Sequence, residues 1–377
     1  MKKNIALYML YVAICICMCS CFTEKSGTNE APSVSRPPGL SQREIENIEP
    51  LPVDRFSVYT AGLIPGPVIP GLFEGAVPQG LAYYADADLM MISNYMFDGR
   101  ASNITLFSMS GEAPVKTLWL MNGSGSPHTG HVGGLAAAGK RLWIASGNKF
   151  YAIPLDDVIA ASDGARIAFR EEYEPVVTCS FAASAGGVLY IGEFTSADGS
   201  YTTPESHHYR TSGTALNHAL MAGFILDEER WDTGESDDID GGQDYDSGHM
   251  SGDNVHPDFL LSLPDEVQGA VFTDELIILS LSYGRRNTSR LASYRSPLRD
   301  EPDRSFTLPD GNTVPVYVLD KTDLVRSVNA PPMSEGITAY RDKIAVLYES
   351  GSDKYRSSAL LPQDHIHLLE RELFRPK

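Results

Sequence analysis

The chain repeats one short pattern of polar, small and apolar positions five times. In each copy a polar or small residue precedes a small residue, apolar positions follow, and a second apolar segment lies a few residues further on. The aligned small residues are Gly80, Gly134, Ser180, Gly269 and Gly336. The second apolar segments cover residues 89–93, 142–146, 188–192, 276–280 and 344–348. Each copy predicts two paired strands, and five copies of one such unit predict a repeat fold.

The spacing of the copies indicates which repeat fold this is. The aligned small residues are separated by 54, 46, 89 and 67 residues. A four-stranded propeller blade takes about 40 to 50 residues, so the first two intervals fit directly and the later two contain insertions. We therefore predict an all-β protein, a β-propeller of five blades with six as the alternative. Most blades are expected to hold four antiparallel strands.

Weaker apolar segments are expected to complete the blades. They are residues 103–109 and 115–120 in the first blade, 150–153 and 166–169 in the second, 220–226 and 259–263 in the third, and 314–319 as an outer strand of the fourth. Residues 365–369 are expected as an outer strand of the last blade or as the closing segment. Residues 56–60 alternate in polarity and are expected to pair with the last blade and close the ring.

The N-terminal region has the pattern of an export signal. Lys2 and Lys3 precede an uncharged apolar run over residues 5–18, which is short for a membrane span. The run ends in Met18-Cys19-Ser20-Cys21, which resembles the lipobox of bacterial lipoproteins. The resemblance implies that residues 1–20 are removed and that a lipid on Cys21 anchors the protein to a bacterial membrane of the cell envelope. The alternative is a signal peptide whose cleavage releases a soluble protein.

Two further segments differ in composition from the repeats. Residues 21–53 are rich in polar residues, proline and glycine in their first part, so we expect a flexible tether ahead of a propeller domain over residues 54–377. Within that domain, residues 227–258 are rich in Asp, Gly and Ser and favour neither helix nor strand. They are expected to form a long acidic loop or a disordered insertion.

Composition limits the partners and the chemistry. The 377 residues include 33 Gly and 24 Pro, which suits an all-β protein with many turns. The formal net charge of −19 argues against nucleic acid as a partner, because phosphate binding needs a basic face. Of the five cysteines only Cys179 lies in the body of the chain. A chain that begins at a lipidated Cys21 therefore has no intrachain disulfide.

The repeat also predicts where a ligand would bind. The first strand of each propeller blade lines the central channel, so the residues before the aligned small positions are expected at one mouth of that channel. The ends of the second strands form another polar set. With two nearby loop residues, the ligand-binding candidates are Gln79, Asn94, His131, Glu193, Gln268, Arg285, Glu335 and Glu349. The alternative is that these side chains satisfy backbone groups at the turns.

Metal binding is indicated only by local clusters. His128 and His131 are three residues apart and would ligate a metal ion if they shared one turn. In the acidic loop, carboxylates at short spacing suit Ca²⁺, which takes several oxygen ligands. These candidates are Asp238, Asp240, Asp244 and Asp246. A loop histidine pair and a solvated charge run are the alternatives.

The phrase Pro78-Gln79-Gly80-Leu81-Ala82, with its copy at residues 132–136, resembles secreted bacterial β-propellers. The related rings are the YVTN-type and the strictosidine-synthase/gluconolactonase-like propellers, and the resemblance covers roughly residues 55–370. In the lactonase-like rings a Glu-Gly phrase in an early blade supplies a metal ligand. Here that phrase is Glu335-Gly336 in the last copy.

Two functions of different classes follow from this reading. The first is a binding or scaffold protein of the cell envelope whose ligand is a small molecule, a glycan or a protein. The second is a calcium-dependent hydrolase or lactonase that uses Glu335, Glu193 and Asn94 around a channel metal. A sugar-active enzyme would need two or three opposed carboxylates in the channel. No catalytic residue is assigned, and the sequence does not decide between binding and catalysis.

Overall fold

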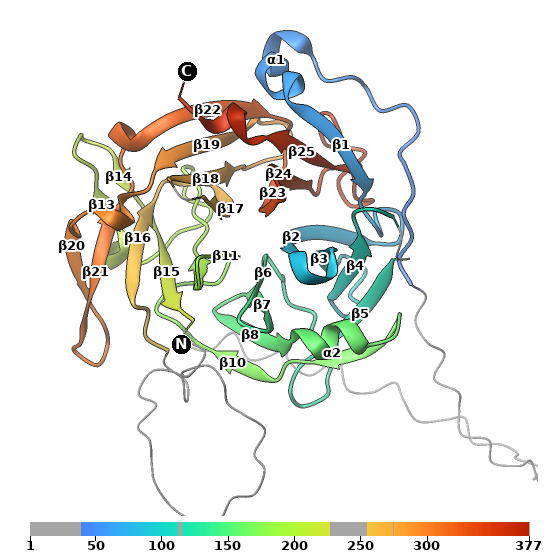
Figure 1. The fold of residues 1–377 in the computed structure, drawn as a ribbon, viewed down its shortest axis with the longest axis horizontal. Coiled ribbons are helices and arrows are strands. Elements are labelled where there is room, and N and C mark those ends of the chain that lie inside the picture. The colour runs from blue at the N-terminus through green and yellow to red at the C-terminus, as the bar shows by residue number, and fades with distance from the viewer. Residues whose placement is uncertain (1–38, 112–114, 227–254, 274, 377) are drawn as a thin grey trace, which may run out of the picture. The chain divides into compact units, whose positions relative to one another are not determined.

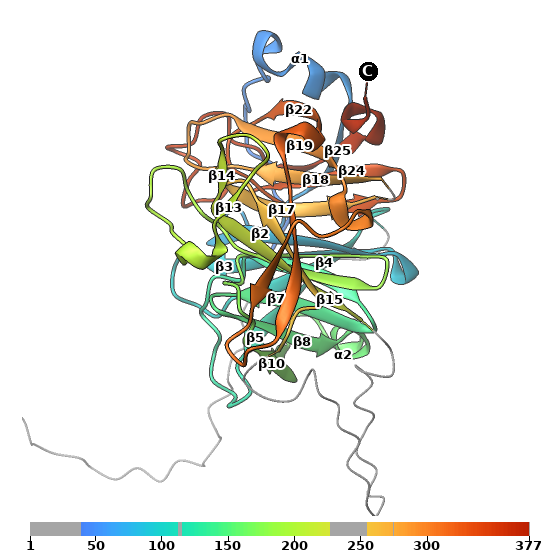
Figure 2. The ribbon, with the colours of Figure 1, turned by 90° about the vertical axis from the view of Figure 1, so that its left-hand side faces the viewer.

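The computed structural model describes residues 39–111, 115–226, 255–273 and 275–376, which form a five-bladed β-propeller. The first strand of each sequence repeat is the innermost strand of its blade: β2 (Ala76–Tyr84), β6 (Gly134–Ala138), β11 (Phe181–Ala185), β17 (Val267–Phe272) and β23 (Ser334–Tyr340). Each inner strand contacts the inner strands of both neighbouring blades, and the last contacts the first. Figure 1 shows the inner strands around the centre of the ring, and Figure 2 shows the blades edge-on. The prediction of an all-β propeller with five blades is confirmed.

The other strands follow outward in each blade. The first blade adds β3 (Leu89–Met96), β4 (Asn103–Ser108), β5 (Lys116–Met121) and β9 (Arg166–Ala168). The second adds β7 (Arg141–Ser146), β8 (Lys149–Pro154) and β10 (Glu171–Tyr173). The third adds β12 (Val188–Gly192), β15 (Ala219–Ile225), β16 (Phe259–Leu263), β21 (Thr313–Val318) and β20 (Arg304–Thr307).

The last two blades have four strands each. The fourth adds β18 (Leu276–Leu281), β19 (Ser289–Arg295) and β22 (Leu324–Ala330). The fifth adds β24 (Lys343–Tyr348), β25 (His365–Glu370) and β1 (Leu63–Val68). A separate hairpin pairs β13 (Tyr209–Arg210) with β14 (Leu216–Asn217).

Helices are few and short in the described residues. The α-helices are α1 (Val53–Ala61) and α2 (Leu155–Ala160). The 3-10 turns are Ala85–Ala87, Glu205–His207, Pro297–Arg299, Lys321–Asp323 and Arg371–Phe374. No helix in this part of the chain is long and apolar enough to cross a membrane.

Glycines in the repeat let the inner strands approach one another. A Cβ on Gly134 would lie 2.1 Å from the backbone nitrogen of Ala182 in the next blade. A Cβ on Gly80 would lie 2.5 Å from the nitrogen of Leu135, and one on Gly336 would lie 2.6 Å from the nitrogen of Leu81. Real Cβ atoms do not come this close, so glycine is a packing requirement of the ring at these three positions.

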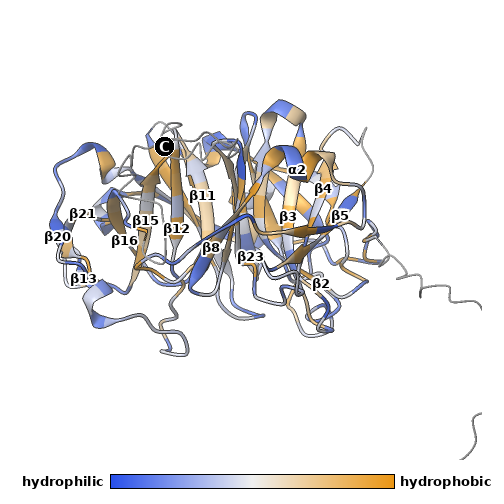
Figure 3. Cartoon of the chain, turned by 90° about the horizontal axis from the view of Figure 1, so that it is seen from below, coloured by the Kyte–Doolittle hydropathy of each residue, from blue (hydrophilic) through white to orange (hydrophobic). Residues whose placement is uncertain are grey.

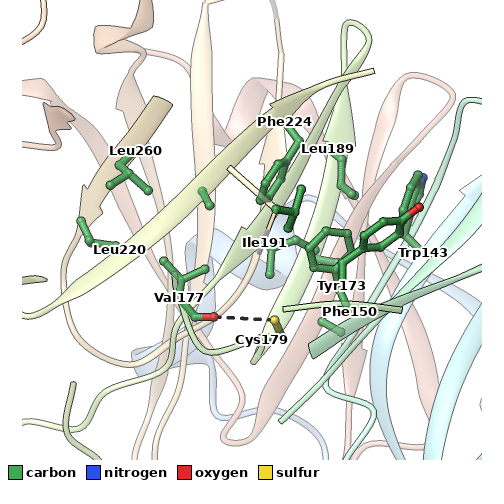
Figure 4. Packing of buried hydrophobic residues seen from close by; sticks show 14 of the residues in the cluster. Trp143, Phe150, Tyr173, Val177, Cys179, Leu189, Ile191, Leu220, Phe224 and Leu260 are labelled. Atoms are coloured by element: carbon green, nitrogen blue, oxygen red, sulfur yellow. Dashed lines mark hydrogen bonds between the residues drawn. The ribbon is translucent and has the colours of Figure 1, made fainter. Parts of the chain in front are cut away.

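The core consists of apolar side chains packed between adjacent blades. One cluster joins Trp143 and Phe150 of the second blade to Leu189, Ile191 and Phe224 of the third (Figure 4). Figure 3 shows apolar residues concentrated along the strands and polar residues toward the connecting loops. Burial on both faces of each blade follows from stacking the sheets around an axis, and explains the continuous apolar runs in the second strands.

Two outer-strand predictions were wrong. Residues 166–169 were expected in the second blade, but β9 pairs in parallel with β5 of the first, and β10 is the outer strand of the second. Residues 314–319 were expected in the fourth blade, but β21 pairs in parallel with β16 of the third. The outer strand of the fourth blade is β22, which pairs with β19.

The ring is closed by a different segment from the one predicted. Residues 56–60 lie in helix α1, and β1 instead pairs antiparallel with β25, which makes residues 365–369 the third strand of the last blade. Phe56 and Tyr59 are both buried, and their three-residue spacing places them on one helical face. The Tyr59 hydroxyl lies 2.6 Å from the Tyr348 hydroxyl and 2.6 Å from His367 Nδ1, which fixes α1 on the last blade.

Residues 39–52, in the segment expected as a tether, lie against the propeller. Leu40 is buried beside Ala76, Met96 and Trp119. The backbone nitrogen of Ile45 donates a hydrogen bond of 2.7 Å to Asp364 Oδ2. The first part of the predicted tether, Cys21 and the signal region lie outside the described residues.

Candidate functional site

A cavity of about 730 Å³ lies where the inner strands of all five blades begin. Each blade contributes to its wall: Gln79 from the first, His131 ahead of the second, Thr178 ahead of the third, Gln268 from the fourth and Glu335 from the fifth. Glu349 and Arg285 come from the loops that follow β24 and β18. The structure therefore brings six of the eight predicted candidates to one cavity at the channel mouth.

Local backbone irregularities place three of these side chains. The pairing register between inner and second strand shifts between Pro78 and Leu81 in the first blade. It shifts between Ser334 and Ile337 in the fifth, and between Val267 and Gly269 in the fourth. Gln79, Glu335 and Gln268 lie in these breaks. A β-bulge redirects a side chain out of the regular alternation, so the repeated polar–small phrase corresponds to a repeated bulge at the channel mouth.

Glu335 and Glu349 form a hydrogen-bonded carboxyl pair in the cavity wall. Only 4% of the surface of Glu335 is exposed, and Gln79 Nε2 donates a hydrogen bond of 3.0 Å to Glu349 Oε2. Burial raises the pKa of Glu335 well above its ordinary value, and the charge of Glu349 raises it further. Burial also raises the pKa of Glu349 to about 7, while hydrogen bonds from Gln79 and Glu335 oppose the shift. Two carboxyl groups in this contact share one proton.

Two cations flank the carboxyl pair and are held on aromatic rings. The guanidinium of Arg285 lies 4.9 Å from the ring centroid of Tyr355, and Nη1 donates a hydrogen bond of 3.1 Å to Ser358. Lys354 Nζ lies 4.8 Å from the ring centroids of Tyr95 and Tyr355 and donates a hydrogen bond of 2.6 Å to the Tyr95 hydroxyl. Both cations lower the pKa of Glu349 and so favour a carboxylate there.

The two histidines of the second blade are not partners. His128 is buried, with Nδ1 2.9 Å from Asn122 Oδ1 and Nε2 3.1 Å from Ser146 Oγ. His131 instead lines the cavity, and its ring lies 4.8 Å from that of Tyr95. Desolvation in the concave wall, together with the charge of Lys354, lowers the pKa of His131, so its imidazole is neutral at pH 7. The two rings have different surroundings, and a metal ion shared between them is not supported.

An aromatic cluster forms another part of the wall. The ring centroids of Phe194 and Tyr201 are 5.3 Å apart, and each lies 6.1 Å from that of Tyr283. All three residues line the cavity, and Tyr201 is 55% exposed. Phe194 and Tyr283 are half-buried, and aromatic rings beside a few polar groups are typical of ligand sites, which are mostly apolar.

Asn94 and Glu193 are not part of this cavity. Asn94 is buried in the first blade, where Nδ2 donates to Asn103 Oδ1 at 3.1 Å. Glu193 is buried in the third, where its carboxylate lies 2.9 Å from His207 Nδ1 and accepts from the backbone nitrogen of Leu220 at 2.9 Å. The predicted lactonase set of Glu335, Glu193 and Asn94 is therefore not assembled, because two of its members bind groups within their own blades.

Metal ligation finds no support in the described part of the chain. Among those residues no group of three or more His, Cys, Asp or Glu side chains is arranged to hold a metal ion. The calcium candidates Asp238, Asp240, Asp244 and Asp246 lie outside the described residues. Cys179, which precedes an aligned small residue, directs its thiol into the core cluster (Figure 4), where burial raises its pKa.

Several cavity residues have no counterpart in the sequence prediction. Phe194, Tyr201, Tyr283, Met333 and Tyr355 line the cavity from loops or strand ends. They occur at different positions in different blades, so the repeat contains no signal for them. Only Tyr283 lies in a segment that local sequence singles out, because it precedes Arg285.

Comparisons with known proteins are distant. No family model matches the chain, and no curated protein matches it. Among solved structures, a glutaminyl cyclase from Myxococcus xanthus is 10% identical with a TM-score of 0.36, and the match covers 78% of this chain and 90% of that one. A gluconolactonase from Xanthomonas campestris is 11% identical with a TM-score of 0.36 over 86% and 89% of the two chains.

A further match is the Dos1 propeller, with 9% identity and a TM-score of 0.30 over 85% of this chain and 77% of that one. Similarity this distant says nothing about activity. The five-blade assignment rests on the strand pairing described above. The finer resemblance to YVTN-type or lactonase-like rings has no matching family model.

Proposed function

We propose that this protein is an exported, lipid-anchored protein of the cell envelope that binds a small polar ligand in the cavity at the channel mouth. The observation that carries the proposal is the convergence of all five blades on one cavity with a buried carboxyl pair. A volume of about 730 Å³ falls within the usual range for small-molecule sites, roughly 300–1,000 Å³. Residues of the second half of the inner strands line only a smaller cavity, of about 210 Å³.

Some polar groups in this cavity have hydrogen-bonding capacity that contacts within the protein do not use. Gln268 Nε2 makes one long hydrogen bond of 3.3 Å to the backbone oxygen of Ser282. Glu349 accepts from Gln79 and Glu335 and keeps part of its surface accessible. Burying Glu335 and half-burying Glu349 costs stability, and ionisable groups retained at such a cost cluster at functional sites.

The binding proposal is tested by a thermal-shift screen of the full-length protein in detergent against a library of small polar metabolites. A compound that binds only the folded state raises the melting temperature, and the rise grows with the logarithm of its concentration above Kd. We expect at least one compound whose shift disappears in Gln268→Ala and persists in Asn329→Ala, a matched change on outer strand β22. Compounds that shift both variants equally, or no compound at all, would contradict the proposal.

The anchor is tested separately, because it rests on the N-terminal sequence. Mass spectrometry of the purified protein should find a diacylglyceryl group on Cys21 as the first residue. A Cys21→Ser variant should move from the membrane fraction to the soluble fraction or retain its signal segment. An unmodified N-terminus after residue 20 would contradict the lipid anchor and leave the cavity proposal standing.

A metal-independent hydrolase at the same cavity is the second candidate. The specific observation that favours it is the carboxyl pair, in which one group donates a proton while the other accepts one. Hydrolysis of γ- and δ-lactones, followed as acid release at constant pH, should then be lost in Glu349→Gln and be unchanged by EDTA. Absence of turnover, or turnover that EDTA removes, would eliminate this candidate.

A further inference from the structure

The chemistry of the cavity wall restricts the ligand class, on the premise that the cavity is the binding site proposed above. The wall has an exposed aromatic part and a polar part, so a ligand that fills it needs an apolar face and several hydrogen-bonding groups. Phe194, Tyr201 and Tyr283 form the aromatic part, with rings 5.3–6.1 Å apart. Such a cluster stacks a flat face of C–H groups or a ring.

The polar part offers both donors and acceptors. In the Glu335–Glu349 pair the shared proton lies between the two groups, and the half-buried Glu349 presents carboxyl oxygens that accept. Gln79 uses its amide nitrogen on a backbone oxygen and on Glu349 Oε2, so it offers only its carbonyl oxygen. Gln268 makes one long hydrogen bond to a backbone oxygen and keeps both a donor and an acceptor. A hydroxyl group also donates and accepts, and a set of neighbouring hydroxyls therefore matches this wall better than a ligand with one kind of group.

The charges in and around the cavity disfavour a charged ligand. A cationic ligand would approach Arg285 and Lys354, which already lie beside the carboxyl pair. An anionic ligand would approach the Glu349 carboxylate and a chain with a formal net charge of −19. Both cations are held over Tyr355, one with Ser358 and the other with Tyr95 as hydrogen-bond partner, so they are already engaged with the protein.

From these three features we infer that the cavity binds a neutral saccharide. One face of a sugar ring stacks on the cluster of Phe194, Tyr201 and Tyr283. Hydroxyl groups of the sugar donate to Glu349 and to the Gln79 carbonyl oxygen, and accept from the amide of Gln268. The cavity volume of about 730 Å³ leaves room for a short oligosaccharide.

The test uses the full-length protein in detergent and ligand-observed NMR, which detects weak binding, followed by calorimetry for affinities. The neutral probes are glucose, galactose, xylose, maltose and cellobiose, and the charged probes are glucuronate and glucosamine. We expect a neutral sugar to bind more tightly than both charged analogues. Tyr201→Ala should weaken that binding about tenfold, because a stacked ring is lost.

Phe97→Ala is the matched control. Phe97 is an exposed aromatic residue, with 48% of its surface accessible, and it does not line the cavity. Its removal should leave sugar affinity unchanged. Equal losses in the two variants, or no binding by any neutral sugar, would overturn the saccharide assignment. If only charged or other polar compounds bind, in a manner that Gln268→Ala abolishes, the saccharide inference fails while the proposed binding function stands.

Discussion

At the scale of single residues, the account depends on a carboxyl pair in which Glu335 is buried and Glu349 is half-buried. Glu335 and Glu349 are held together by a bulge in β23 and by the loop after β24, and Gln79 supplies one further hydrogen bond. In the folded protein their pKa values lie above the ordinary range, Glu349 at about 7. The folded state therefore holds protons that the unfolded state has released.

This difference predicts how stability depends on pH. Above the unfolded pKa of a glutamate, near 4.3, the folded state binds more protons than the unfolded state, so stability falls as pH rises. The free energy of unfolding should drop by about 1.4 kcal/mol per pH unit while the difference is one proton. Urea unfolding at about pH 5.5, 7 and 8.5 measures this free energy at three points across the expected decline.

Glu335→Gln is the matched comparison, because the amide keeps the shape of the protonated acid without its titration. The variant should show a shallower decline of stability across the same pH range. An equal decline in both proteins would show that other groups cause the pH dependence and that the pair does not hold a proton.

At the scale of elements, the repeated phrase in the sequence is a device for packing and for aiming side chains. Its small residue lets neighbouring inner strands approach, and its polar residue lies in a bulge that faces the cavity. The Ser93 hydroxyl also links two blades: it accepts a hydrogen bond from the nitrogen of Gly80 and donates one to the oxygen of Val132 ahead of the next blade. One motif thus determines both how closely the inner strands pack and which polar side chains face the cavity.

The packing role predicts a large effect for a single methyl group. Gly134→Ala places a Cβ 2.1 Å from the nitrogen of Ala182, so strands β6 and β11 must separate. The free energy of unfolding should fall by about 3 kcal/mol, at the upper end for overpacked cores. Gly123→Ala, where no atom lies within 4 Å of the added Cβ, should change it by less than about 0.5 kcal/mol. Similar values for the two variants in urea unfolding would contradict the packing of the inner strands.

Helix α1 offers a second element-scale prediction. Tyr59→Phe removes a buried hydroxyl and leaves the Tyr348 hydroxyl and His367 Nδ1 without this partner. Leaving buried polar groups unpaired costs about 2 kcal/mol. Val58→Ala on the same helix, where the side chain is 41% exposed, should cost under about 0.5 kcal/mol. A Tyr59→Phe protein as stable as the wild type would show that this contact does not fix α1.

Strands that belong to the repeated sequence pattern could be predicted. Strands whose partners are distant in the sequence could not. Inner and second strands follow from the repeat, because burial on both faces demands apolar runs there. Strands β9 and β21 pair in parallel with blades that precede them in the chain, and no local pattern specifies a parallel partner. Residues 56–60 alternate in polarity, which favours a strand. In the structure Phe56 and Tyr59 are buried and Val58 is exposed, which is the spacing of a helix.

The residues of the candidate site also fall into a group that the repeat predicts and a group that it does not. Gln79, Gln268 and Glu335 were found because they occupy one repeated position. Asn94 and Glu193 occupy strand ends that looked equivalent to Glu349, yet hydrogen bonds within their blades hold them away from the cavity. The aromatic wall of Phe194, Tyr201 and Tyr283 lies on non-repeated loops, which only the fold brings together.

At the scale of the whole molecule, five similar blades produce one site that is not symmetric. The inner strands repeat, so the polar residues that they present lie around one axis, and the loops then make one side aromatic and another side acidic. Ring closure by β1 on β25 joins the segment that follows α1 to the last blade. Gln79 of the first blade donates a hydrogen bond to Glu349 of the fifth, so the carboxyl pair lies where the first and last blades meet.

A crystal structure of the protein with its best-bound neutral sugar tests the central claim most directly. The account predicts electron density for the sugar at the channel mouth, with its ring over Tyr201 and its hydroxyls within hydrogen-bond distance of Glu349 and Gln268. Density for the sugar on the rim of a blade or between loops, with the axial cavity holding only water, would contradict it.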